Sequence, residues 1–265
     1  HPEDPRSPGY VRHWYIDLGD CFGSEWSVDA ISKRHGFTYL FDPGHIGRDF
    51  VTLGIPERPW DVARRTPGEE LFGYFSARNF DPATWRGEYP NPTFGRMTEH
   101  DGAWAARIIA RFTPAHVAAM VRVGDFTNGA HTQFLTNVLV ERRQILLQRY
   151  FSQLSPVTDV HVEKRSICAV DLARREQIYA PDAFQYAGTV SRGGSSPVPL
   201  GVSVQDGGHL CVSLDPAPAL GGADDAAERY VVVQITNGAS RGPLVLHLYD
   251  LGEPRGLQLV GIERL

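Results

Sequence analysis

The spacing of apolar residues changes at Pro156, and this change constrains the fold more than any other feature of the sequence. Before Pro156, apolar residues recur at helical spacing over about 98–112, 113–124 and 130–152. After it, short alternating or apolar runs are separated by turn signals such as Asn237-Gly238. Helices followed by strands along the chain are typical of the α+β class.

We therefore predict an α+β protein in two parts. Residues 1–157 are expected to form a helical, loop-rich part, and residues 158–265 a β-rich, sandwich-like part. One short helix is expected near 171–178. The runs expected to form strands are 160–170, 183–190, 198–204, 208–214, 229–236, 243–249 and 257–263.

The first two of the three main helices have clear start signals. Thr98 can cap the first, because acidic residues follow it, and Thr113 precedes a proline, which suits the first helical position. Within the first helix, Trp104, Ile108 and Phe112 are spaced to form one apolar stripe. We expect this stripe to be the buried face of the helix.

Composition excludes several classes of protein. Of the 265 residues, 42% are hydrophobic and 22% charged, as in ordinary globular proteins. No apolar run approaches the roughly 18 residues of a membrane span, and the net charge of −5 argues against a nucleic-acid binder. The cysteines, Cys21, Cys168 and Cys211, allow at most one disulfide, so they leave the cellular compartment undecided.

The segment Ile16-Asp17-Leu18-Gly19-Asp20 is the strongest candidate for a metal site. Residues 10–18 are rich in aromatic and branched residues and predict a strand that ends at Gly19. An apolar strand would hold the Asp17 carboxylate in place for a divalent cation, and Asp20 could ligate the same ion. The alternative is a strand that ends at a plain turn.

This pentapeptide resembles the metal-binding motif of aminoglycoside-phosphotransferase-like kinases and, more loosely, the Asp-Phe-Gly of protein kinases. Further segments resemble a family of large, functionally uncharacterised bacterial proteins, over most of residues 10–155 and, more thinly, over the last thirty-five. The segments that carry this resemblance are 12–20, 52–60, 80–92, 103–109, 141–143 and 260–264. The resemblance implies the C-terminal half of a kinase-like domain, with Mg²⁺ or Mn²⁺ held by Asp17; at position 20 the family more often has serine.

The chain lacks the other parts that phosphoryl transfer needs. No glycine-rich loop with a strand lysine and no His-Arg-Asp catalytic loop precedes Asp17. A magnesium-dependent phosphotransferase would therefore need an upstream lobe, on the same or a partner chain. The strand at 10–18 is the expected edge for pairing with that lobe or with a partner chain.

A non-catalytic scaffold or binding module is the second hypothesis. The aromatic stretch at 60–94 could stack sugar rings or contact a partner protein, or it could fill the core beneath a long loop. Glu141-Arg142-Arg143 could meet an anion, or its helix could face a partner or form salt bridges within the protein.

Overall fold

The structure is a computed structural model. It describes Phe22 and the ranges 32–63, 70–78, 80–87, 89–215 and 226–265. The strand predicted at 10–18, together with Asp17, Asp20 and Cys21, lies outside the described residues.

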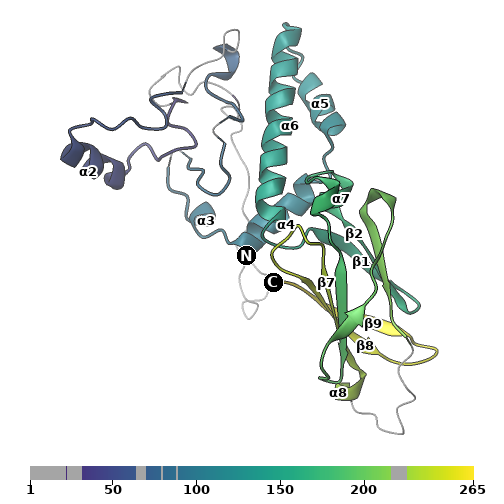
Figure 1. The fold of residues 1–265 in the computed structure, drawn as a ribbon. Helices are drawn as coiled ribbons and strands as arrows, with labels where there is room; N and C mark the ends of the chain where they lie inside the picture. The colour runs from purple at the N-terminus through teal and green to yellow at the C-terminus, as the bar shows by residue number, and fades with distance from the viewer. Residues whose placement is uncertain (1–21, 23–31, 64–69, 79, 88, 216–225) are drawn as a thin grey trace, which may run out of the picture.

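The protein is α+β, as predicted (Figure 1). Helices and short 3₁₀ turns dominate up to Phe151, and strands dominate from Val157 onward. The helices are α2 (Pro43–Thr52), α3 (Pro92–Gly95), α4 (Glu99–Ile109), α5 (Pro114–Arg122), α6 (Gly129–Phe151), α7 (Leu172–Arg175) and α8 (Ala226–Arg229), with 3₁₀ turns η2 (Glu70–Phe72), η3 (Pro181–Ala183) and η4 (Asp206–Gly208). The strands are β1 (Val157–Glu163), β2 (Ser166–Asp171), β3 (Ala187–Arg192), β4 (Val198–Leu200), β5 (Ser203–Val204), β6 (His209–Ser213), β7 (Tyr230–Thr236), β8 (Leu244–Asp250) and β9 (Leu257–Arg264).

The predicted helix starts are confirmed. The Thr98 hydroxyl accepts a hydrogen bond from the Asp101 amide, and the Asp101 carboxylate accepts one from the Thr98 amide. Thr113 and His116 form the same reciprocal pair at the start of α5. These bonds satisfy amide groups that have no partner within the helix.

The predicted buried stripe of α4 is wrong. Trp104, Ile108 and Phe112 are 61%, 42% and 45% exposed. The buried face of the helix instead carries small residues, Gly102, Ala103, Ala106 and Ala110. Small residues let two helices approach closely, and α4 uses this face to pack against the C-terminal end of α6.

The run 160–170 is also not a single strand. Lys164 adopts a left-handed backbone conformation, with φ of 57°, and the chain turns there from β1 into β2. The two strands pair antiparallel, with Glu163 opposite Ser166.

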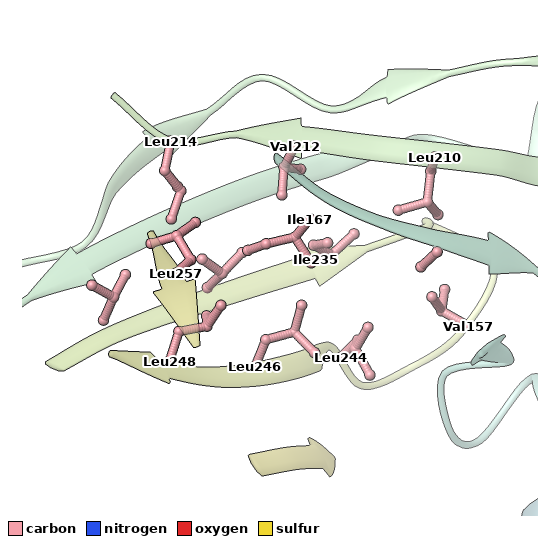
Figure 2. Close-up of a cluster of buried hydrophobic side chains, with 13 residues drawn as sticks. Val157, Ile167, Leu210, Val212, Leu214, Ile235, Leu244, Leu246, Leu248 and Leu257 are labelled. Carbon is pink, nitrogen blue, oxygen red and sulfur yellow. The ribbon is translucent and has the colours of Figure 1, made fainter. Parts of the chain in front are cut away.

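The strands form two antiparallel sheets that share one hydrophobic core. Their orders are β1-β2-β6-β5 and β4-β3-β7-β8-β9. Figure 2 shows Leu210, Val212 and Leu214 of the first sheet facing Leu244 and Leu246 of the second. This arrangement agrees with the predicted sandwich-like part, because the inner faces of both sheets supply the core.

An ion cluster joins the two sheets at one end. Asp250, at the end of β8, accepts hydrogen bonds from Arg165 in the β1–β2 turn at 2.7 Å and from Arg192 of β3 at 2.9 Å. Hydrogen bonds from Arg165 are the largest of the effects that lower the pKa of Asp250 to about 2. Both arginines also donate to the Asp215 carbonyl.

A second polar cluster lies where α7 leaves the sandwich. The buried Asp171 accepts hydrogen bonds from the amides of Ala173 and Arg174, which caps α7. Its other carboxylate oxygen accepts from the Tyr186 hydroxyl and the Asn237 amide, both at 2.9 Å. Burial, followed by the Asp171 charge, raises the pKa of Tyr186.

Candidate functional site

Neither carboxylate of the predicted metal site can be placed, because Asp17 and Asp20 lie outside the described residues. Within the described ranges, one group of three possible metal ligands comes together: His161, Glu163 and Cys168. The sulfur of Cys168 is bonded to Cys211, so it is not a free thiolate. The remaining histidine and carboxylate are both exposed and do not make a closed metal site.

A pocket of about 320 Å³ lies between α6 and the loop-rich segment that precedes it. In Figure 1 this segment lies on the side of α6 opposite to α5. Its walls mix aromatic and charged side chains. The aromatic and charged lining residues include Lys33, Tyr74, Arg78, Phe80, Trp85, Glu141 and Arg142.

Arg142 is the central charge of this pocket. Its guanidinium carbon lies 3.9 Å from the ring centre of Phe75 and 4.6 Å from that of Phe80. Its Nε donates to the Ser76 carbonyl at 2.8 Å. Burial lowers the pKa of Arg142 to about 10, so the side chain is still charged at neutral pH.

Positive charge exceeds negative charge in the pocket. Among the described residues, Lys33, Arg78 and Arg142 form no ion pair with a carboxylate. Lys33 Nζ lies 5.6 Å from the ring centre of Tyr74. Glu141 is the only carboxylate among the described lining residues, so an anionic ligand is favoured.

Trp85 gives the pocket an aromatic wall. Gly36 exchanges two backbone hydrogen bonds, of 2.9 and 3.2 Å, with Arg86, the residue that follows Trp85. Gly36 has φ of +90°, and a Cβ added there would lie 3.1 Å from the indole nitrogen of Trp85. The positive φ and the short distance to the indole both favour glycine at position 36, because a side chain there would strain the backbone and press against the indole. Trp85 as a whole remains 37% exposed.

The two sequence-based interpretations of Glu141-Arg142-Arg143 apply to different residues. Glu141 and Arg142 line the pocket. Arg143 is buried and donates to Glu176 at 2.7 Å and to the Ala110 carbonyl at 3.0 Å. Sequence reasoning identified this motif and the aromatic stretch, but it assigned no role to Lys33, which is more than a hundred residues away from Arg142.

Comparison with known proteins adds no relative: no family model, curated protein or solved structure matches this chain. Within the described ranges, every helix is too short or too polar to cross a bilayer, in agreement with the predicted lack of a span there. The class that fold and site define is an α+β protein with a positively charged, aromatic pocket beside its longest described helix.

Proposed function

We propose that this chain is a binding module for an anionic carbohydrate, such as a sugar phosphate. The observation that carries this proposal is the half-buried charge of Arg142, which has no carboxylate partner among the described residues. Burying a cation without a counter-ion is costly, and a bound phosphate or carboxylate would offset that cost. Lys33 and Arg78 add positive charge to the same pocket.

The aromatic residues favour a sugar as the body of the ligand. Trp85, Tyr74 and Phe80 line the same pocket as the cations. An aromatic ring presents a flat apolar face, which suits the C–H face of a sugar ring, while the cations suit its anionic group. A pocket of about 320 Å³ is at the small end of the range for small-molecule sites.

The test is a calorimetric titration with glucose 1-phosphate and with glucose. We expect the wild type to bind the phosphate ester more tightly, because only the ester pairs with the cations. Lys33→Gln should weaken the binding of the ester about tenfold, which is the scale of one charge-assisted hydrogen bond, and leave the binding of glucose unchanged. Trp85→Ala should weaken both ligands.

The chain offers matched controls for both variants. Lys164, the second of its two lysines, lies in the β1–β2 turn, so Lys164→Gln should bind like the wild type. Phe94→Ala is the control for Trp85→Ala and should also bind like the wild type. Phe94 is 60% exposed on α3 and does not line the pocket. Equal binding of glucose and its phosphate ester, or equal losses in Lys33→Gln and Lys164→Gln, would refute the proposal.

The second candidate is the metal-binding half of an atypical kinase-like protein. The motif at Ile16–Asp20 and the family resemblance favour it. Asp17 would hold Mg²⁺ or Mn²⁺, with Asp20 as a further ligand, and phosphoryl transfer would require an upstream nucleotide-binding lobe. A pocket rich in cations is compatible with a phosphorylated substrate.

This candidate has its own test. Calorimetric titration with Mg²⁺ or Mn²⁺ should show binding that Asp17→Ala abolishes. Binding that is unchanged in Asp17→Ala would remove the metal role of Asp17, without affecting the proposal for the positively charged pocket.

A further inference from the structure

A second, largely apolar groove shares Arg142 and Phe80 with the pocket described above. It has a volume of about 540 Å³ and is lined by residues of α4, α5 and α6 and the loops between them, together with Phe22 and Phe80. Figure 1 shows α5 alongside α6, and the groove follows this pair. It differs from the positively charged pocket because nearly all of its lining side chains are apolar.

The floor and the rim of the groove differ in exposure. Val117, Val121 and Leu135 are buried and form its floor. At the rim, Phe112 and Met120 are 45% and 53% exposed. An apolar surface that is concave and open to solvent is typical of a binding site for an apolar group.

Positive charge interrupts this apolar surface on α6, between Leu139 and Leu146. Arg142 and Arg143 are the only cations among the described lining residues, and no carboxylate lines the groove with them. The buried Nε–H of Arg143 has no hydrogen-bond acceptor in the described part of the chain, although Nη2 of the same side chain donates to Glu176. Arg142 forms no ion pair within the described ranges.

We propose that this groove binds a single-chain amphiphilic carboxylate, a fatty acid, with its hydrocarbon chain along α5 and α6 and its carboxylate at Arg142. A neutral hydrocarbon would bury Arg142 further without a counter-ion, which is unfavourable. A small polar anion would leave the apolar walls in water. A fatty acid offers a carboxylate to the cation and a hydrocarbon chain to the apolar walls. This inference shares Arg142 with the proposed sugar-phosphate site, but a separate, apolar cavity carries it.

The test compares dodecanoate with 1-dodecanol by calorimetric titration of the full chain. Dodecanoate should bind at least about tenfold more tightly than the alcohol, because only the acid pairs with Arg142. Met120→Glu places a negative charge at the exposed rim and should weaken dodecanoate binding about tenfold or more. Val123→Glu is the matched control, because Val123 is exposed just beyond α5 and does not line the groove.

The outcomes separate this proposal from the alternatives. Lys33→Gln should leave dodecanoate binding unchanged, and Met120→Glu should leave glucose 1-phosphate binding unchanged. No binding of dodecanoate, equal binding of the alcohol, or equal effects of Met120→Glu and Val123→Glu would overturn the proposal. It would also be overturned by a concentration-dependent dimer that Met120→Glu dissolves and that dodecanoate does not affect, because the groove would then cover a second copy of the chain.

Discussion

At the scale of single residues, Gly102 shows how closely α4 and α6 approach each other. A Cβ built on Gly102 would lie 2.0 Å from a ring carbon of Tyr150, which is itself buried. Neither ring nor helix can move without disturbing the cluster that also contains Ala106 and Leu147. The helix therefore buries its glycine and alanine face, and its large side chains remain outside.

Gly102→Ala should destabilise the fold although alanine favours helices. We expect a loss of about 1–3 kcal/mol in the free energy of unfolding, measured by urea denaturation, because the added methyl group overpacks the contact. Gly129→Ala in the first turn of α6 is the control, since no described residue lies within 4 Å of the added Cβ. That variant should be neutral or slightly stabilised. An equally stable Gly102→Ala would contradict the close packing.

The Asp250 cluster predicts an acid-sensitive contribution to stability. The pKa of Asp250 is lowered from 3.8 to about 2, so its folded carboxylate releases its proton more readily than the unfolded one. A lowered pKa adds stability above the unfolded value, and this contribution is lost as pH falls from about 5 through about 2. Its size is on the order of 2 kcal/mol.

Asp250→Asn tests this contribution. At neutral pH the free energy of unfolding of the variant should be about 3 kcal/mol lower than that of the wild type, because Arg165 and Arg192 lose their buried counter-ion. Urea unfolding of both proteins between pH 6 and pH 3, as rough limits, should show the difference narrowing as the solution is acidified. A constant difference across this range would count against the lowered pKa.

At the scale of elements, local sequence signals predicted the helix caps correctly, whereas the buried face of a helix was not predicted. The caps at Thr98 and Thr113 depend on neighbouring residues, so they can be recognised from the sequence. The buried face of α4 depends on what packs against it, and a small-residue face competes with a large apolar stripe in the same helix. The turn at Lys164 was missed because no glycine marks it.

The disulfide between β2 and β6 is expected to contribute to the stability of the fold. Cys168 and Cys211 face each other across neighbouring strands, with 4.2 Å between their Cα atoms. The bond closes a long loop, so Cys168→Ser together with Cys211→Ser should cost roughly 2–4 kcal/mol of stability. A reducing agent should lower the wild-type unfolding midpoint and leave that of the double variant unchanged. Equal midpoints of wild type and variant under oxidising conditions would contradict this expectation.

At the scale of the whole molecule, the α+β class and the two antiparallel sheets follow from sequence periodicity, because the period changes from helical to alternating. The division at 157 into two units stays a prediction, and α7 and Val170 pack in one cluster with α4 and α6. The positively charged pocket could not be predicted as a whole. It combines Lys33, Trp85 and Arg142, which are distant in sequence and meet only through the tertiary fold.

The expected pairing edge at 10–18 is also a prediction about the whole molecule. If this strand pairs with a partner chain, light scattering should show a dimer or a heteromeric complex, and amides 11–17 should be protected from hydrogen exchange in it. A monomer in which these amides exchange freely would argue against the pairing.

The central claim is that an anionic group binds beside Lys33 and Arg142 in the pocket along α6. A crystal structure of the protein with glucose 1-phosphate tests it most directly. The claim predicts that the phosphate lies within hydrogen-bonding distance of Lys33 Nζ or the Arg142 guanidinium, with the sugar against Trp85. A structure with that pocket empty at saturating ligand, or with the ligand bound elsewhere, would contradict it.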